Sequence, residues 1–245
     1  MIFLFTDFGA DGPYVGQMRA AIARVYPDVA VVDLCHDLPP FRPRSAAYLL
    51  AALVDQLPVG AIVVGVVDPG VGSERRAVVL TADGRCFIGP DNGLFSVVAR
   101  RADQTHWREL IGARSRLSAT FHGRDVFAPA AARVVAGQDL ETAPMGQPAI
   151  GLEWPEDLAE IIYVDHYGNA MTGLRASHLK ASDALALDSH QIPFARTFSD
   201  VPAGAAFWYE NSNGLVEIAV NQGRADGGLG LRVGSPVRVY PSHSN

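Results

Sequence analysis

Six short polar clusters in this 245-residue chain contain the residue types that move protons or bind polar ligands. They occupy residues 6–9, 68–72, 89–93, 121–125, 165–169 and 211–214. The first three directly follow apolar, strand-like segments, and open α/β sheets place their ligand crevice at such strand ends. We therefore regard Asp7, Asp68 and His122 as candidates for chemistry, because carboxylates and imidazoles orient water and accept its protons.

Each cluster, taken alone, also fits ordinary turn chemistry. Asp-Gly and Asn-Gly pairs are common turn formers, since Gly adopts positive φ and Asp or Asn side chains bond to nearby backbone. On this interpretation Asp7 caps a helix, Arg75 is a solvated charge and His122 is a hydrogen-bonded residue at a helix start. The functional interpretation depends on how many clusters share a strand-end position.

The first half of the chain alternates strand and helix signals. Apolar segments at residues 1–5, 29–34 and 61–67 have the length of strands, and residues 14–26 and 43–53 carry apolar side chains at helical spacing. An Asp83-Gly84 turn joins two further strands in a hairpin. Further helices are expected after residue 93 and over residues 125–135. This alternation predicts an α/β domain with a central, largely parallel sheet.

The second half has a different character. Between residues 137 and 160, glycine, proline and scattered acidic residues give the composition of a linker. Beyond it, short strand-like runs are separated by turn residues such as Asn213-Gly214, and no run has convincing helical periodicity. We expect an α/β domain over residues 1–145, a linker over 146–159 and a smaller all-β, barrel-like domain over 160–245.

The composition argues against several classes of protein. The chain is 49% hydrophobic and 19% charged, which is typical of a folded globular protein. Its longest apolar run, residues 46–54, is too short to span a membrane, and the net charge of −6 argues against nucleic acid as a partner. Cys35 and Cys86 lack the spacing of a zinc site or a disulfide framework, and the apolar N-terminus has no basic leader. We therefore expect a cytoplasmic protein.

The polar clusters belong to six motifs, which are TDFG at 6–9, VDPGVGSERR at 67–76, GPDNGL at 89–94, TFHGRDVFAPAAA at 120–132, VDHYGN at 164–169 and NSNGLVEIAVNQG at 211–223. In these motifs and their order, the chain resembles the S-adenosyl-L-methionine hydroxide adenosyltransferase family, whose members are related to fluorinase and chlorinase. The resemblance covers nearly the whole chain. It implies hydrolysis of S-adenosyl-L-methionine to adenosine and L-methionine without a cofactor or metal, in a homotrimer whose active sites lie between subunits.

The resemblance also implies a catalytic set of Asp68, Arg75 and His122, with Arg76 as the alternative arginine. Attack on the ribose C5′ displaces a neutral thioether from a sulfonium, so the leaving group needs no acid. Asp68 and His122 would orient and deprotonate water, while the arginine favours the ionised carboxylate. Asp68 stands where the halogenating relatives have a tyrosine, and its charge would repel a halide, so water is the better nucleophile.

For the adenosine part of the substrate, the resemblance implies four contacts. Asp7 matches the acid that holds the ribose hydroxyls, which suits a carboxylate because it accepts two hydrogen bonds. Tyr167 matches an aromatic residue that packs on the adenine, and the backbone near Val220 and Gln222 is expected to meet the adenine edge.

For the methionine part, Asp165 and Asn169 match residues near the amino group of the substrate. Ser212 lies where the halogenating relatives have a serine that contacts methionine. At the next position those relatives use an arginine, whereas this chain has Asn213. The residue that holds the substrate carboxylate is therefore left open.

Two other functions fit the same residues. A metal-assisted phosphoester hydrolase would bind Mn²⁺ or Mg²⁺ through Asp7, Asp68, Asp91, His122 and Asp125, although the sequence contains no HxH or HxxxH pair. A non-catalytic nucleoside-binding module would use the strand-end residues to hold adenosine without turnover. We rank hydrolysis of S-adenosylmethionine first, the metal-assisted hydrolase second and the binding module third.

Overall fold

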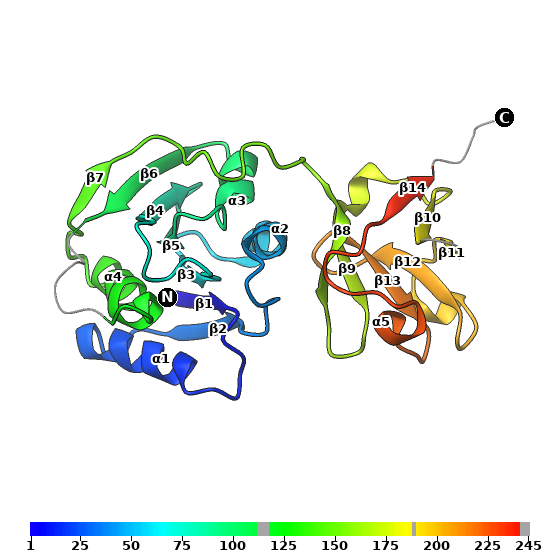
Figure 1. Ribbon diagram of the computed structural model, residues 1–245, viewed down its shortest axis with the longest axis horizontal. Helices are drawn as coiled ribbons and strands as arrows, with labels where there is room; N and C mark the ends of the chain where they lie inside the picture. The colour runs from blue at the N-terminus through cyan, green and yellow to red at the C-terminus, as the bar shows by residue number, and fades with distance from the viewer. Residues whose placement is uncertain (112–117, 188–189, 241–245) are drawn as a thin grey trace. The chain divides into compact units, whose positions relative to one another are not determined.

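The computed structural model describes residues 1–111, 118–187 and 190–240 of the chain (Figure 1). The chain forms two compact units, Met1–Glu153 and Trp154–Asn245. We call them unit 1 and unit 2. The domain limits expected from the sequence, at residues 145 and 160, lie on either side of this division and stay a prediction.

Unit 1 is built on a mixed sheet of seven strands in the order β2-β1-β3-β5-β4-β6-β7. Its parallel part consists of β2 (Val31–Cys35), β1 (Ile2–Thr6), β3 (Ile62–Val66) and β5 (Arg85–Pro90). Antiparallel pairing then adds β4 (Ala77–Ala82), β6 (Thr105–Leu110) and β7 (Thr142–Pro144). The expectation of an α/β fold with a largely parallel central sheet is confirmed.

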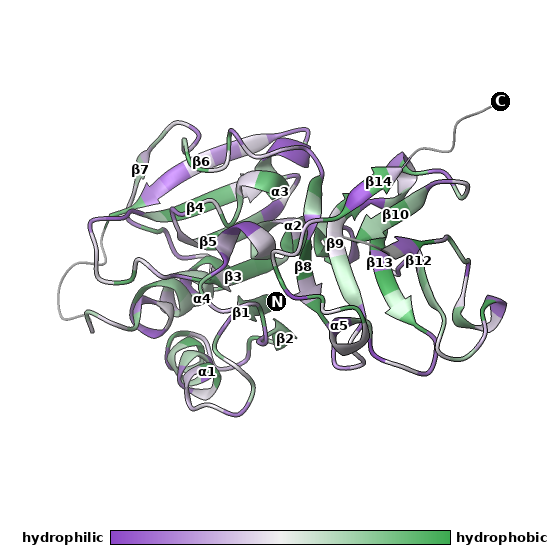
Figure 2. Cartoon of the chain, turned by 45° about the vertical axis from the view of Figure 1, so that its right-hand side comes forward, coloured by the Kyte–Doolittle hydropathy of each residue, from purple (hydrophilic) through white to green (hydrophobic). Residues whose placement is uncertain are grey.

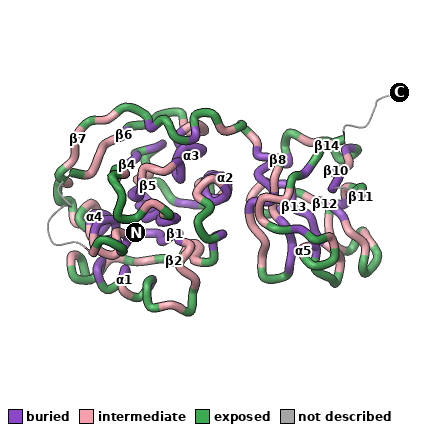
Figure 3. Tube along the Cα trace, viewed as in Figure 1, coloured by how far each residue is buried: buried purple, intermediate pink, exposed green. Residues whose placement is uncertain are grey.

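Helices cover both faces of this sheet, as Figure 1 shows. They are α1 (Tyr14–Val25), α2 (Pro43–Leu53) with the short η1 (Val54–Gln56), α3 (Ser96–Arg101), and α4 (Ala128–Val135), which follows the π-helical turn η2 (Gly123–Phe127). Helix α1 packs against α4, and α2 packs against α3. On one face, Ile2 and Leu4 of β1 pack in one core with Met18 and Ile22 of α1. Strands β1 and β3 are buried along their whole length (Figure 3), because side chains on both faces meet helices.

The pairing of β1 with β3 positions the polar clusters. The two strands are parallel, and Thr6 at the end of β1 is opposite Val66 at the end of β3. The backbone N–H of Asp7 also donates to the carbonyl of Val66 at 3.3 Å. Asp7 and Asp68, which directly follow these strands, therefore lie at the same edge of the sheet.

Unit 2 is built from antiparallel strands. A four-stranded sheet has the order β12-β13-β9-β8, and a three-stranded sheet has the order β11-β10-β14. The strands are β8 (Leu158–Val164), β9 (Ala170–Arg175), β10 (Ala184–Leu187), β11 (His190–Ile192), β12 (Ala206–Glu210), β13 (Leu215–Val220) and β14 (Arg238–Tyr240). Short helical turns at η3 (Ala176–His178), η4 (Phe198–Asp200) and α5 (Ala225–Gly228) connect them. Leu185, Trp208 and Ile218 share one core cluster, which confirms the predicted β-rich second part.

Four strands, β6, β7, β9 and β11, do not correspond to segments expected from the sequence. Strand β6 has mostly polar residues, as Figure 2 shows, and Trp107 is its one buried residue, so it lacks an apolar run. Strand β7 lies in the segment of linker composition, and Pro144 is tolerated there because β7 is at the edge of the sheet. Strand β9 contains Gly173, whose added Cβ would lie 2.8 Å from the carbonyl oxygen of Leu158 on the neighbouring strand.

Among the described residues, no helix is both long and apolar enough to cross a membrane.

Candidate active site

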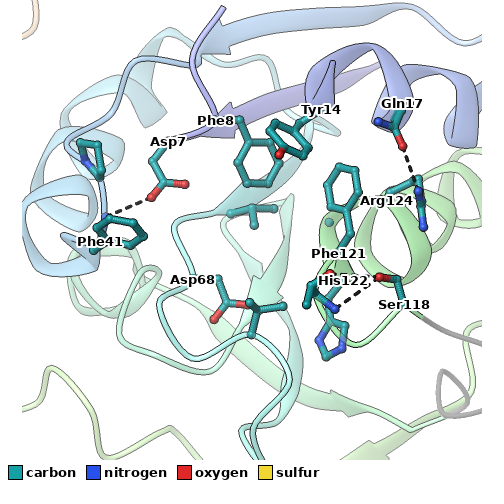
Figure 4. A pocket seen from close by; sticks show the side chains of 15 residues that line it. Asp7, Phe8, Tyr14, Gln17, Phe41, Asp68, Ser118, Phe121, His122 and Arg124 are labelled. Atoms are coloured by element: carbon teal, nitrogen blue, oxygen red, sulfur yellow. Dashed lines mark hydrogen bonds between the residues drawn. The ribbon is translucent and has the colours of Figure 1, made fainter. Parts of the chain in front are cut away.

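A cavity of about 600 Å³ lies in unit 1 at the edge of the sheet where β1 and β3 end (Figure 4). Asp7 follows β1, Asp68 follows β3, and His122 directly precedes the turn η2. All three line this cavity, as the sequence analysis expects for residues with a shared function. The strand-end clusters are thus brought together by the parallel pairing of the sheet.

Arg75 connects Asp68 to His122. Its Nε donates to Oδ1 of Asp68 at 2.8 Å, and its Nη2 donates to Oδ2 of the same carboxylate. The same Nη2 lies 3.0 Å from Nδ1 of His122. The guanidinium also lies over the ring of Phe127, with 5.5 Å from Cζ to the ring centroid. The three residues that the family resemblance nominates as catalytic are therefore in direct contact.

Arg76 has different partners. Its Nε donates to Oδ2 of Asp91 at 2.8 Å, and its side chain is 43% exposed, against 9% for the side chain of Arg75. The two adjacent guanidinium groups thus reach different carboxylates. Of the two arginines left open by the sequence, Arg75 is thus the one that contacts Asp68 and His122.

The contact with Arg75 determines the protonation state of His122. A guanidinium has only hydrogen-bond donors, so Nδ1 of His122 must accept and the proton of the neutral ring lies on Nε2. Burial, together with the positive charge of Arg75, lowers the pKa of His122 below its usual value of 6.5. His122 therefore stays neutral at physiological pH and presents an N–H donor at Nε2.

Asp7 is held by the backbone of a neighbouring loop. The N–H of Phe41 donates to Oδ2 of Asp7 at 3.1 Å, and Figure 4 shows the other carboxylate oxygen directed toward the cavity. Burial raises the pKa of Asp7, and the charge of Asp68 adds to this effect. Phe41 itself has a positive φ of 61° and its side chain is 74% exposed. The loop thus adopts an uncommon backbone conformation that orients one oxygen of Asp7 and leaves the other available to a ligand.

Three aromatic rings form a wall of the cavity that the sequence analysis did not predict. The ring centroids of Phe8, Tyr14 and Phe121 lie 5.4 to 5.7 Å apart, and the guanidinium of Arg124 lies 5.0 Å from the centroid of Phe121. Nη1 of Arg124 donates to Oε1 of Gln17 at 2.9 Å, which holds the arginine over the ring. Phe8 and Phe121 belong to two of the polar clusters, and their place in these clusters was the one signal in the sequence for an aromatic wall. The wall offers apolar faces to a ring-shaped ligand.

Unit 2 contains a second cavity, of about 800 Å³. It lies at the β8–β9 turn and at the ends of β12 and β13. The predicted substrate-binding residues of the second half all line it, namely Asp165, Tyr167, Asn169, Ser212, Val220 and Gln222. The structure thus groups the predicted residues into two sets, one in each unit.

Asn169 holds the carboxylate of Asp165 in place. The backbone N–H of Asn169 donates to Oδ1 of Asp165 at 2.8 Å, and its Nδ2 donates to Oδ2 at 3.1 Å. Gly168 permits this turn, because its φ is +85° and an added Cβ would lie 2.6 Å from Oδ1 of Asp226. Tyr167, at the tip of the turn, is 73% exposed. An acid with a fixed orientation and an exposed aromatic ring therefore lie at the same turn.

Glu217 and Arg224 also line this cavity and were not predicted from the sequence. Glu217 is 2% exposed and accepts hydrogen bonds from Oη of Tyr209 at 2.6 Å and from Nδ2 of Asn211 at 2.7 Å. Arg224 pairs with Asp226 at 2.9 Å. The available signal for Glu217 was a single acid inside the otherwise apolar strand β13.

The metal-site alternative does not fit the contacts of its proposed ligands. Asp68 is paired with Arg75, Asp91 with Arg76, and Asp125 with Arg124 at 2.6 Å. At these three carboxylates, a guanidinium supplies the positive charge that a metal ion would otherwise provide. Within residues 1–111, 118–187 and 190–240, no group of three or more His, Cys, Asp or Glu residues could hold a metal ion.

The chain combines an α/β unit that contains a partly buried Asp–Arg–His set with a β unit that contains a polar cavity. These features define a class of two-part proteins, and comparison with known families identifies it. The SAM hydroxide adenosyltransferase N-terminal domain matches residues 2–144, and the C-terminal domain of the same family matches residues 159–238. The chain belongs to the SAM hydroxide adenosyltransferase family.

Known relatives span nearly the full chain. An (R)-S-adenosyl-L-methionine hydrolase from Thermus thermophilus is 41% identical, with 97% of this chain and 98% of the relative covered. A protein of the same name from Salinispora arenicola is 40% identical, with 96% and 95% covered. The crystal structure of a conserved protein from Thermotoga maritima superposes with a TM-score of 0.88 at 29% identity, covering 98% of this chain and 99% of that chain.

Proposed function

We propose that this protein hydrolyses S-adenosyl-L-methionine to adenosine and L-methionine by in-line attack of water on the ribose C5′. The observation that carries this proposal is the partly buried contact of Arg75 with both Asp68 and His122 at the strand ends of unit 1. The names of the two hydrolase relatives specify (R)-S-adenosyl-L-methionine, so we propose this epimer as the substrate.

The reaction forms a C5′–O bond while the C5′–S bond breaks, and the bonding electrons leave with a neutral thioether. The attacking water becomes strongly acidic as the new bond forms, so even a weakly basic carboxylate can accept its proton. We assign that role to Asp68, whose oxygens keep lone pairs free beside the two bonds from Arg75. The N–H at Nε2 of His122 positions the water oxygen.

Arg75 is the residue that fixes this arrangement. It holds both oxygens of Asp68 and keeps Nδ1 of His122 unprotonated, so the carboxylate and the imidazole take complementary roles as acceptor and donor. Holding water in line with the C5′–S bond removes an orientational cost that amounts to several kcal/mol, on the order of the gain known for intramolecular reactions. Because the leaving group is already neutral, these steps need neither an acid nor a cofactor.

The rest of the substrate is assigned to both cavities. Asp7 binds the ribose hydroxyls through the carboxylate oxygen that faces the cavity of unit 1. In unit 2, Asp165, held by Asn169, lies near the methionine amino group, and Ser212 contacts the methionine part. Tyr167 packs on the adenine, while the backbone at Val220 and Gln222 meets the adenine edge.

We further propose a homotrimer in which unit 1 of one subunit and unit 2 of a neighbouring subunit complete each active site. The reacting groups and the predicted groups for the amino end of the substrate lie in separate cavities, which supports this arrangement. A trimer containing both Asp68→Asn and Asp165→Asn chains should recover activity that neither variant has alone, because some sites then combine two intact halves. Mixed trimers without any recovered activity would contradict the shared site.

We also propose a cytoplasmic location. Both cysteines, Cys35 and Cys86, are free thiols, and burial raises the pKa of each to about 12. Thiols with such a high pKa are protonated and react slowly.

Chromatography of the products from each sulfonium epimer tests the proposed reaction. We expect adenosine and methionine in equal amounts, with faster turnover of the (R) epimer, and activity that persists in the presence of a chelator. Absence of adenosine from the reaction with purified wild-type protein would contradict the proposal. Tight binding of adenosine without turnover would instead support a nucleoside-binding module.

A further inference from the structure

Glu217 is a carboxylate buried in the middle of an antiparallel sheet. Strand β13 pairs with β12 on one side and β9 on the other, and Glu217 is opposite Tyr209 and Met171. The adjacent residues Val216 and Ile218 point into the core of unit 2, whereas Glu217 lines the cavity of about 800 Å³ on the other face of the sheet. The side chain is therefore 2% exposed and still forms part of a ligand-sized cavity.

Neutral groups alone hold this carboxylate. The hydroxyl of Tyr209 donates to Oε1, and the amide of Asn211 donates to Oε2. The orientation of the amide is fixed, because its oxygen accepts the N–H groups of Asn213 and Leu215. In the part of the chain that the structure describes, no Lys, Arg or His side chain pairs with Glu217.

The charged groups around the cavity do not neutralise Glu217 either. Burial raises the pKa of Glu217, and the negative charge of Asp165 adds to the effect. Arg224, the basic residue of the cavity wall, is held by both carboxylate oxygens of Asp226. Burying a carboxylate without a cation is costly. A ligand that brings a positive charge with N–H donors would offset this cost.

We propose that Glu217, together with Asp165, binds the α-ammonium group of the substrate and selects sulfonium compounds that carry this group. The inference rests on the proposed hydrolysis of S-adenosylmethionine. That substrate has two cationic groups, but a sulfonium has no hydrogen to donate and belongs beside the reacting groups of unit 1. A carboxylate offers about four acceptor sites, and Tyr209 and Asn211 occupy two of those on Glu217, so the ammonium group can use the others.

The test compares two substrates with three forms of the full-length protein. The substrates are S-adenosylmethionine and its analogue without the α-amino group. The proteins are the wild type, Glu217→Gln, and Glu210→Gln as a matched control. Glu210 is an exposed glutamate of β12 that does not line the cavity. In Glu217→Gln, the amide oxygen can accept from Asn211 and the amide nitrogen can donate to Tyr209, so the hydrogen bonds of the fold are preserved.

We expect the wild type to prefer the amino-containing substrate at least tenfold in kcat/KM. Glu217→Gln should lose at least tenfold in kcat/KM on this substrate, mainly through KM, and should turn over the analogue at close to the wild-type rate. Glu210→Gln should keep the wild-type preference. Adenosine lacks the ammonium group, so its Kd should be the same for all three proteins, which also checks that the cavity is intact.

Three outcomes would overturn the inference. They are equal turnover of both substrates by the wild type, an undiminished preference in Glu217→Gln, and a tenfold weaker Kd for adenosine in Glu217→Gln. A tenfold weaker Kd for adenosine would indicate that Glu217 contacts the adenine instead of the ammonium group. If Glu217→Gln does not fold, equal turnover of both substrates by the wild type would still overturn the inference. Failure of the proposed hydrolysis is a distinct result, because the wild type would then release adenosine from neither substrate.

Discussion

The two cavities hold their acids in opposite ways. In unit 1, Asp68 is bound by Arg75, and the nearby acids Asp91 and Asp125 also pair with arginines. In unit 2, Asp165 is held by an amide and a backbone N–H, and Glu217 by a hydroxyl and an amide. The charge of Asp68 is thus balanced within the protein, whereas Asp165 and Glu217 form no ion pair with any residue that the structure describes.

This difference suits two different tasks. Asp68 is fixed in orientation before the substrate binds, because Arg75 holds both of its carboxylate oxygens in the absence of substrate. Asp165 and Glu217 gain a cationic partner only when a ligand brings one, so they contribute to recognition. Substitutions of Asp68 or Arg75 should therefore lower kcat, while substitutions of Asp165 or Glu217 should raise KM.

The largest effect is expected for Asp68→Asn. The variant keeps the shape of the side chain but loses the proton acceptor, so kcat should fall about 10³-fold, within the range known for general base catalysis. Steady-state assays of adenosine release measure the loss. Asp91→Asn is the matched control, because Asp91 also pairs with an arginine and does not line the cavity of unit 1. Equal losses in both variants would contradict a special role for Asp68.

A smaller effect is expected for Arg75→Lys. Lysine keeps the charge but cannot donate to both oxygens of Asp68 and to His122 in the same geometry, so kcat should fall about 10²-fold, at the lower end of acid–base contributions. Arg76→Lys should stay within about threefold of the wild type, because Arg76 contacts Asp91 instead. Loss of activity in Arg76→Lys alone would assign the catalytic arginine to Arg76.

Asp7→Asn should affect binding of the ribose. The amide can still accept from the N–H of Phe41, but the ribose hydroxyls lose a charged acceptor, so KM should rise about tenfold with kcat little changed. Initial rates over a range of substrate concentrations separate the two constants. A fall in kcat with unchanged KM would place Asp7 in the chemical step and not in binding.

The smallest effect concerns pH. The pKa of His122 lies below 6.5, so the ring is neutral above that pKa and becomes protonated as the pH falls through it. A proton on Nδ1 would face the guanidinium of Arg75, so activity should be constant across neutral pH and decline only on the acidic side of 6.5. The pH dependence of kcat, with ¹⁵N NMR of the ring, measures this. A protonated Nδ1 at neutral pH would contradict the assigned tautomer.

The sequence predicts the α/β unit well, because its strands and helices follow local patterns. The catalytic roles of Asp68, Arg75 and His122 come from the family resemblance and stay a prediction. Asp68 follows a strand of five buried residues, and parallel pairing alone brings its loop beside that of Asp7. The choice between Arg75 and Arg76 could not be made from adjacent positions, since it depends on which guanidinium reaches Asp68 in the folded chain.

Other features of the two cavities depend on tertiary contacts. Tyr14 and Phe121 are aromatic residues of the kind usually found in a protein core. They form a cavity wall only because the loop after β1 packs against η2. Glu217 lies in a strand with apolar neighbours, and its exposure to a ligand depends on which face of the sheet is covered. Neither the coverage of a sheet nor the pairing of distant loops is encoded in short-range spacing.

The most direct test of the central claim is hydrolysis in water enriched in ¹⁸O, followed by mass spectrometry of both products. Attack of water on the ribose C5′ predicts that the label enters the 5′-hydroxyl of adenosine and that methionine remains unlabelled. The Asp68→Asn variant should form labelled adenosine far more slowly. Label in any product other than adenosine, or formation of adenosine without label, would contradict direct attack of water at C5′.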